Sequence, residues 1–267
     1  SIDKNVFTSI DGLGWVYQFW QEDAKAAADA SKKAGNKIQA SEISAKTQLF
    51  TDDYMVEFLL HNTLGAWWAG KNESKIRDAI SRKGSSITEQ DLRDAISLPG
   101  VDWTYLRFAK IPTDIEDDPE GAQIERNWLP AAGFFSDWPR SAKELSVFDP
   151  CMGSGHFLVF ALPILVQMRI LEESLTIEEA ISAVLAENLF GVELDDRCAQ
   201  IAAFNLALTA WKIAGFCQLP ELNIACCGKS LSKHDVEVVK PFLSADYARN
   251  LQSLLTLSNL FPLLGSI

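Results

Sequence analysis

The stretch FDPCMGSGHFLVFA, residues 148–161, most constrains the fold, because in it a short apolar strand meets a glycine turn and then an apolar helix. Asp149 and Pro150 end the strand. The turn that follows contains Gly153, Ser154 and Gly155. Glycines allow backbone N–H groups to approach a ligand closely, and the start of a helix favours a negatively charged group. The stretch therefore predicts a nucleotide-like or nucleoside-like ligand at this turn.

Apolar strands and helices alternate through the C-terminal part of the chain. Strands are predicted at 145–149, 189–195 and 221–227, and helices at 155–169, 176–188 and 196–215. This alternation is typical of an α/β fold with a parallel sheet, whose ligands lie beyond the carboxyl ends of the strands. Asp149 and Glu193 stand at two of these ends. We therefore expect both acids at one edge of the sheet.

The spacing of the turn and the second acid disfavours a dinucleotide. The GxGxxG fingerprint needs a third glycine where Leu158 stands, and its ribose-binding acid follows about 20 residues on. Glu193 comes 38 residues after Gly155. S-adenosylmethionine fits better, since it needs a glycine turn for its amino-acid portion, a carboxylate for its ribose and an apolar residue such as Leu194 beside its adenine. The alternative is that Asp149 caps the helix and Glu193 is a surface acid.

Two helices are predicted in the N-terminal part of the chain. One covers 9–33, and the other opens at Thr51 as its N-cap residue. Apolar residues at helical spacing are expected in the core, namely Trp15, Val16, Phe19 and Trp20 on the first helix and Met55, Phe58, Leu59 and Leu64 on the second. Shorter helical segments are predicted at 76–83 and 88–95. Packing is also the expected role of Trp67, Trp68, Trp128 and Trp138.

Composition excludes several classes of function. The net charge of −12 argues against a chain that binds DNA by itself, because basic side chains that neutralise phosphates supply most non-specific affinity. Five cysteines without a CxxC pair indicate reduced thiols, and the histidines lack metal-ligand spacing. No apolar run reaches about 18 residues, and the start lacks the order of a signal peptide. We expect a cytoplasmic protein without membrane contact, and the missing initiator Met indicates an excised piece.

Three blocks of the sequence resemble amino-group DNA methyltransferases. FDPCMGSGHFLV is similar to their DPACGSGHFLV motif, and FGVELDDRCAQIAAFNLAL is similar to their second motif. TQLFTDDYMVEFLLHNTLGAWW resembles the segment TQLFTPxxIVxYLxxNSLGxxW, which precedes the glycine motif in gamma-type N6-adenine enzymes. With LGWVYQFW before it, the chain most resembles the large adenine methyltransferases of BREX or phage-growth-limitation defence systems and of fused restriction–modification enzymes. The resemblance covers about 12–70 and 145–231.

The resemblance implies the Rossmann-like parallel sheet of S-adenosylmethionine-dependent methyltransferases, truncated and preceded by a helical N-terminal region. We expect a helical region with the upstream cofactor motif at 1–70, a connector or insertion at 71–144 and a partial methyltransferase α/β domain at 145–267. The implied cofactor-binding residues are Thr51, Asp149, Pro150, Gly153, Ser154, Gly155, Glu193, Leu194, Lys229 and Ser230. Thr51 would contact the cofactor carboxylate, and Asp149 with the glycine turn would hold the methionine portion. Glu193 would bind the ribose, and Leu194 would pack on the adenine.

The chain departs from the family pattern at three places. Lys229 and Ser230 stand where the family has an Asp or Asn that hydrogen-bonds the amino group of the cofactor adenine. Asp52 replaces the proline that usually follows the threonine. Cys151-Met152 replaces Ala-Cys and is expected to add bulk close to the cofactor turn. These changes predict weakened cofactor binding.

The loop that carries catalysis in this family, (N/D/S)PP(Y/F), requires a Pro-Pro dipeptide. None of the ten prolines in this chain is followed by another. We therefore expect an N-terminal fragment of a site-specific, adenine-specific DNA methyltransferase that has no catalytic residue of its own and is inactive alone. Double-stranded DNA would bind through the missing C-terminal part, and restriction or phage-defence subunits are further candidate partners. Two alternatives stay open: a methyltransferase acting on protein glutamine or RNA, and a non-catalytic assembly module with a degenerate cofactor site.

Overall fold

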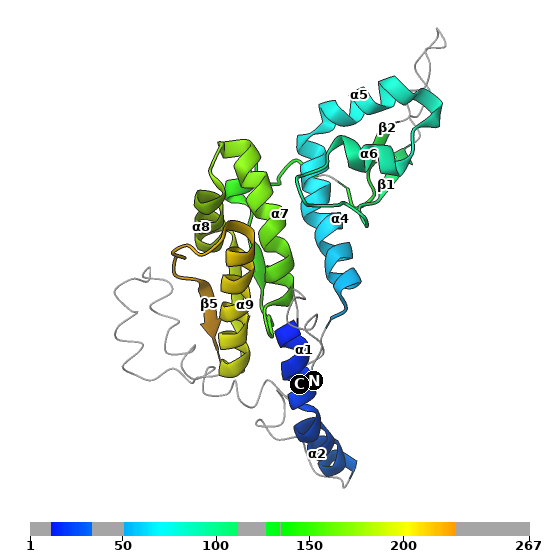
Figure 1. Ribbon diagram of the computed structural model, residues 1–267. Helices are drawn as coiled ribbons and strands as arrows, with labels where there is room; N and C mark the ends of the chain where they lie inside the picture. Colours follow the sequence, from blue (N-terminus) through cyan, green and yellow to red (C-terminus); the bar gives the residue numbers. More distant parts are fainter. Residues whose placement is uncertain (1–11, 34–50, 112–126, 134, 228–267) are drawn as a thin grey trace, which may run out of the picture.

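The computed structural model describes residues 12–33, 51–111, 127–133 and 135–227 (Figure 1). The helices are α1 (Gly12–Trp20), α2 (Glu22–Lys33), α4 (Asp53–Lys71), α5 (Glu73–Lys83), η2 (Gly84–Ser86), α6 (Glu89–Ala95), η3 (Ala142–Glu144), α7 (His156–Glu173), α8 (Ile177–Glu187) and α9 (Asp196–Ala214). The strands are β1 (Phe108–Ile111), β2 (Asn127–Pro130), β3 (Val147–Asp149), β4 (Leu189–Glu193) and β5 (Asn223–Cys226). None of the helices in these ranges combines the length and apolar character that crossing a membrane requires.

The sheet that carries the glycine turn is parallel and has the strand order β3-β4-β5. Asp149 pairs with Gly191, and Glu193 pairs with Cys226, so the carboxyl ends of the three strands lie at one edge. α7 and α8 connect β3 to β4, and α9 connects β4 to β5. α7 packs against α8 and α9 (Figure 1). This arrangement confirms the predicted α/β fold with a parallel sheet.

Local sequence signals set the ends of the connecting helices. At the start of α8, the Thr176 hydroxyl accepts a hydrogen bond from the Glu179 N–H, while the Glu179 carboxylate accepts one from the Thr176 N–H. α9 ends at Gly215, whose φ of 80° a residue with a side chain rarely adopts. α7 begins directly after Gly155. The helices predicted at 155–169, 176–188 and 196–215 are therefore confirmed, although α7 continues to Glu173.

A buried polar cluster fastens the start of β3 to α7 and α8. Asn188 is fully buried and donates its amide hydrogens to the carbonyl oxygens of Ala142 at 2.9 Å and Leu145 at 2.6 Å. Its side-chain oxygen accepts a hydrogen bond from Arg169 at 2.9 Å, and its backbone carbonyl accepts one from the Val147 N–H at 2.8 Å. A buried polar group without partners costs about 1–3 kcal/mol. The cluster therefore fixes where β3 begins, and with it where the glycine turn lies.

The predicted N-terminal helix is divided at Gln21 into α1 and α2. Three apolar residues that were expected in the core are exposed instead, namely Val16, Phe19 and Trp20. The side chain of Trp15 lies outside the described part of the chain. Tyr17 faces inward, and its hydroxyl donates a hydrogen bond to Asp195 at 3.2 Å. This polar contact with the start of α9 decides how α1 is rotated, and apolar spacing alone did not reveal it.

The buried face of α4 also differs from the prediction. α4 begins at Asp53 with Asp52 as its N-cap residue, so Thr51 lies one position further out than expected. Leu64 is buried as expected, whereas the exposed residues are Met55, Phe58 and Leu59. The buried stripe runs instead through Val56, Leu60 and Leu64, which are four residues apart. Since α4 is apolar on two faces, the spacing could not indicate which face packs on α7.

The segment that follows α4 packs back onto it. β1 and β2 form an antiparallel pair. The Trp68 indole N–H donates to the Ile96 carbonyl oxygen at 2.9 Å. A Cβ on Gly65 would lie 2.9 Å from the Trp103 ring, so glycine lets this ring approach α4.

Several expectations for this segment are confirmed. The short helices predicted at 76–83 and 88–95 correspond to α5 and α6. The expected packing is found for Trp67 and Trp68, which are buried, and for Trp128 and Trp138, which pack against the core. The division of the chain at 1–70, 71–144 and 145–267 stays a prediction.

Candidate functional site

The turn after β3 depends on two glycines with a left-handed backbone. Gly153 has a φ of 54° and Gly155 has a φ of 82°. A Cβ on Gly155 would lie 2.9 Å from the Cβ of Ala202, because α9 packs directly against the turn. A Cβ on Gly153 would meet no atom within 4 Å. The turn is therefore closely packed at Gly155 and borders open space at Gly153.

Glu193, the last residue of β4, is hydrogen-bonded to this turn. Its Oε2 accepts a hydrogen bond from the Gly153 N–H at 2.7 Å. Its Oε1 accepts hydrogen bonds from the N–H groups of Leu194 at 2.7 Å and Asp195 at 3.0 Å. The structure thus brings Gly153 and Glu193 together at the ends of adjacent strands. Glu193 is half-buried and engaged with the backbone, so it is not an isolated surface acid.

Asp149, the last residue of β3, is a second carboxylate at this edge. Its Oδ1 accepts a hydrogen bond from the Cys151 N–H at 3.1 Å, whereas the N-cap residue of α7 is Gly155, so Asp149 does not cap the helix. Burial raises the pKa of Asp149, and the nearby Glu193 carboxylate raises it further, against the opposing effect of the Cys151 N–H. Because the two carboxylates repel each other, a cation near both would stabilise both. This edge therefore favours a positively charged ligand.

β5 brings a third strand end to the same edge. The Cys227 N–H donates to the Glu193 carbonyl oxygen at 2.8 Å, and the Cys226 thiol donates to the Leu194 carbonyl oxygen at 3.5 Å. The Leu194 side chain is exposed beside Glu193. Burial raises the pKa of the Cys227 thiol, and the neighbouring Cys226 and Glu193 raise it further. This thiol therefore stays protonated at neutral pH and is a poor nucleophile.

Two packing contacts beneath the turn were not singled out from the sequence. The Asn205 amide on α9 donates to the Ser154 carbonyl oxygen at 3.0 Å. Met152 is buried, and its sulfur occupies the space that a Cβ on Gly191 would need. The bulk of Met152 is therefore directed into the core beneath the turn, whereas Cys151 is exposed, and the effect of this pair on cofactor binding stays a prediction. Both contacts join residues far apart in the sequence, so local spacing gave no signal for them.

The upstream motif meets the turn at its start. His156, the first residue of α7, places its Nε2 3.2 Å from Oδ1 of Asp53, the first residue of α4. Thr51 precedes Asp53 by two residues and is half-buried. The proposed adenine contacts Lys229 and Ser230 lie outside the described residues, as does the first part of the upstream motif at 47–50. Of the ten predicted site residues, the structure therefore describes eight and leaves the roles of all of them as predictions.

An apolar cavity of about 390 Å³ opens beside Asp149, between α4, α7 and β3. Leu59 and Leu64 of α4, Phe157 of α7 and Phe148 of β3 contribute to its wall. Asp149 is the one charged residue among those that line it. Within the described ranges, no group of three or more His, Cys, Asp or Glu side chains is arranged to hold a metal ion. The space around the strand ends is thus apolar on one side and acidic at its edge.

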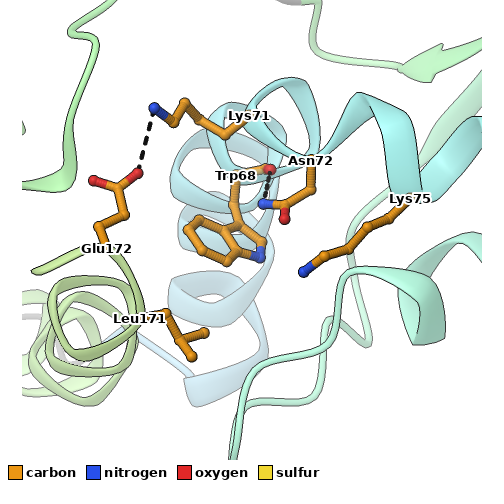
Figure 2. Close-up of a pocket in the computed structure, with 6 residues that line it drawn as sticks. All are labelled: Trp68, Lys71, Asn72, Lys75, Leu171 and Glu172. Atoms are coloured by element: carbon orange, nitrogen blue, oxygen red, sulfur yellow. Dashed lines mark hydrogen bonds and ion pairs between the residues drawn. The ribbon is translucent and has the colours of Figure 1, made fainter. Parts of the chain in front are cut away.

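A larger pocket of about 540 Å³ lies at the opposite end of α7 (Figure 2). Its wall includes Lys71, Lys75 and Glu172, and the Lys71 ammonium is 3.5 Å from the Glu172 carboxylate. The Lys71 ammonium also donates to the Arg140 carbonyl oxygen at 2.5 Å. Glu172 follows His156 along α7 by a rise of roughly 24 Å. This pocket is therefore separate from the strand ends, and its Lys71 ammonium already has partners.

The parallel sheet, the glycine turn that opens α7 and the hydrogen bond from that turn to Glu193 are typical of α/β proteins that bind nucleotides or nucleosides. Comparison with known proteins narrows this class. The family described as MmeI, DNA-methyltransferase domain, matches residues 136–222, which contain both the turn and Glu193. A putative type II restriction enzyme and methyltransferase of Methanocaldococcus jannaschii is 36% identical over 70 residues, which are 24% of this chain and 6% of that protein.

Two longer matches cover most of the chain. The adenine-specific methyltransferase PglX of Lacticaseibacillus casei is 29% identical over 199 residues, which are 74% of this chain and 14% of PglX. The adenine-specific methyltransferase BrxX of Escherichia coli is 28% identical over 212 residues, which are 78% of this chain and 14% of BrxX. The chain is homologous to these adenine-specific methyltransferases, which confirms the resemblance, and it spans about 14% of their length.

Proposed function

We propose that this chain is the cofactor-binding part of a site-specific DNA methyltransferase that transfers a methyl group from S-adenosylmethionine to adenine N6, in restriction–modification or phage defence. The observation that carries the proposal is the 2.7 Å hydrogen bond from the Gly153 N–H to the Glu193 carboxylate. This hydrogen bond joins the glycine turn after β3 to the acid at the end of β4. Homology to adenine-specific methyltransferases supports the reaction class. The fold that we propose is a truncated Rossmann-like methyltransferase sheet.

The residues at the strand ends fit this cofactor. When bound, S-adenosylmethionine supplies an electrophilic methyl group on a positively charged sulfur. The open side of Gly153 leaves room for its amino-acid portion, and Asp149 and Glu193 offset its positive charge. We assign the methionine portion to Asp149, Pro150, Gly153, Ser154 and Gly155, and its carboxylate to Thr51. Lys229 and Ser230 complete the proposed set near the adenine.

Glu193 and Leu194 are suited to the adenosyl portion. A carboxylate offers about four acceptor positions, and the N–H groups of Gly153, Leu194 and Asp195 occupy three on Glu193. The remaining position, on Oε2, can accept a hydrogen bond from a ribose hydroxyl. The exposed Leu194 side chain offers an apolar surface for the adenine ring.

We place the methylation step itself outside this chain. The chain has no Pro-Pro dipeptide and therefore no (N/D/S)PP(Y/F) loop, which would accept hydrogen bonds from the amino group of the flipped adenine. The net charge of −12 supports our proposal that most phosphate contacts are made by other parts of the protein. Double-stranded DNA, and restriction or phage-defence subunits, are the partners that we propose for the whole protein.

Calorimetric titration of the 267-residue chain with S-adenosylhomocysteine tests the proposal. We expect saturable binding that Glu193→Ala weakens by about tenfold or more, since a hydrogen bond to a charged group is lost and the turn is released. Glu221→Ala, which removes an exposed acid before β5, is the matched control and should leave binding unchanged.

Two results would contradict the proposal. Absence of binding would favour the non-catalytic assembly module. Methyl transfer from S-adenosylmethionine to adenine-containing DNA by the chain alone would contradict our placement of the methylation step outside this chain.

A further inference from the structure

His156 and Asp53 link two helices that are distant in the sequence. His156 is 8% exposed and is the first residue of α7, while Asp53 is the first residue of α4. The His156 Nε2 lies 3.2 Å from the Asp53 Oδ1. The His156 ring also packs against Phe160, with 4.9 Å between the ring centres, which restrains its orientation. The link therefore joins the start of the upstream helix to the residue that directly follows the glycine turn.

The helix ends make an acid the suitable partner for His156. α4 and α7 both begin here, and the N-terminal end of a helix carries a partial positive charge. A carboxylate at these ends is stabilised by their partial charge, and Asp53 attracts the protonated His156 imidazole as an ion pair whose geometry is not that of a hydrogen bond. Two consecutive acids are available, and Asp53 is the one that meets His156. Its neighbour Asp52 is exposed and makes no side-chain hydrogen bond to cap α4.

The rest of the contact between α4 and α7 is apolar. Val56 and Leu60 of α4 are buried in the same core as Leu158 and Val159 of α7. Apolar burial is non-directional, so a polar contact at the helix ends adds to the restraint that this packing places on α4. The polar contact between the first residues of the two helices supplies this added restraint.

We propose that the His156–Asp53 pair positions Thr51 so that its hydroxyl can donate a hydrogen bond to the carboxylate of the bound methionine portion. The inference rests on the proposed function and adds two positioning residues to it. Thr51 is connected to Asp53 through the extended Asp52, with φ of −60° and ψ of 142°. Any displacement of the first turn of α4 therefore carries Thr51 with it.

The test compares two ligands that share the adenosine and the thioether and differ in the amino-acid portion. The 267-residue chain and its Asp53→Ala variant are titrated with S-adenosylhomocysteine and with 5′-methylthioadenosine. We expect the Kd for S-adenosylhomocysteine to rise about tenfold in the variant and the Kd for 5′-methylthioadenosine to stay unchanged. Glu221→Ala, which removes an exposed acid before β5, is the control and should change neither value. Because the Asp53 side chain is 53% exposed, the variant should fold, which thermal unfolding verifies.

A double-mutant cycle separates positioning from a merely structural role. Thr51→Val should also weaken the binding of S-adenosylhomocysteine. The double variant with Asp53→Ala should bind no more weakly than the weaker-binding single variant, because both substitutions remove the same interaction. Three results would each overturn the inference without affecting the proposed function: an equal loss of affinity for both ligands in Asp53→Ala, additive losses in the cycle, or unchanged affinity in Asp53→Ala. A wild-type chain that binds neither ligand would overturn the proposed function and this inference with it.

Discussion

Gly153 and Gly155 share a left-handed backbone but differ in what surrounds them. An added methyl group would face open space at Gly153 and would meet Ala202 at 2.9 Å at Gly155. Only the second position therefore combines backbone strain with a steric collision. The sequence indicated that both glycines matter, but it could not distinguish these two reasons, because Ala202 comes from a different helix.

Gly155→Ala should lower the free energy of unfolding by roughly 2–4 kcal/mol, of which backbone strain contributes about 1–2 kcal/mol and overpacking the rest. Gly153→Ala should cost about 1–2 kcal/mol, from backbone strain alone. Urea unfolding of the two variants measures the difference. Equal losses would show that α9 does not restrict the turn.

Glu193→Gln should lower affinity for S-adenosylhomocysteine and loosen the turn at the same time. Both carboxylate oxygens accept backbone N–H groups, whereas the amide of glutamine would turn a donor toward at least one of them. We expect about tenfold weaker binding in calorimetry, with Glu221→Gln as the control. Unchanged affinity would argue that the carboxylate has no contact with the ligand.

Cys151 provides a direct probe of whether a ligand is bound at the glycine turn. It is exposed and lies two residues after Asp149 and two before Gly153, whereas the half-buried Cys217 lies beyond the far end of α9. S-adenosylhomocysteine should slow alkylation of Cys151 by iodoacetamide and leave the rate at Cys217 unchanged. Peptide mass spectrometry after timed alkylation reads both sites in one sample. Protection of neither thiol would place the ligand elsewhere.

Elements with their own terminal signals were predicted well. α8 has the Thr176 and Glu179 capping pair, α9 ends at Gly215, and β3 ends at Asp149 before the turn. These signals act over a few residues, so the sequence contains them. The buried faces of α1 and α4 were predicted incorrectly because distant partners decide them, such as Asp195 for Tyr17 of α1.

The Asn188 cluster fixes the start of β3 by linking it to α7 and α8. Asn188→Ala would leave Arg169 and the carbonyl oxygens of Ala142 and Leu145 without this buried partner. We expect a loss of about 3 kcal/mol in the free energy of unfolding. Asn72→Ala, which removes one partly buried hydrogen bond to Trp68, should cost less than half as much. Chemical denaturation of both variants checks the order.

For the whole molecule, the sequence was sufficient to predict the parallel sheet and to predict which strand ends lie at the same edge. It was not sufficient for the contacts that close the site. The His156–Asp53 pair joins residues 103 positions apart, and Met152 fills the space over Gly191. Such contacts depend on how helices pack on the sheet, which neither periodicity nor motif spacing describes.

His61, a buried residue of α4, should make the stability of the molecule sensitive to acid. Its Nδ1 accepts a hydrogen bond from the Tyr105 N–H at 3.2 Å. Burial, with a smaller effect of Arg93, lowers its pKa from 6.5 to about 4. The unfolded chain binds the proton below pH 6.5 and the folded chain does so only near pH 4. The free energy of unfolding should therefore fall as the pH drops through this window, by up to about 3 kcal/mol.

His61→Asn keeps an acceptor for the Tyr105 N–H and removes the titrating group. We expect this variant to lose less stability than the wild type between pH 7 and about pH 4.5. Urea unfolding at the two pH values provides the comparison. An identical pH dependence would show that other groups cause the acid sensitivity.

The hydrogen bond from Gly153 to Glu193 has a consequence for the kinetics of ligand binding. The bend is already held in shape before any ligand arrives, so docking requires little further ordering and loses little entropy there. Association should then be fast and free of a slow conformational phase. Differences in affinity among ligands should arise mainly from differences in their dissociation rates.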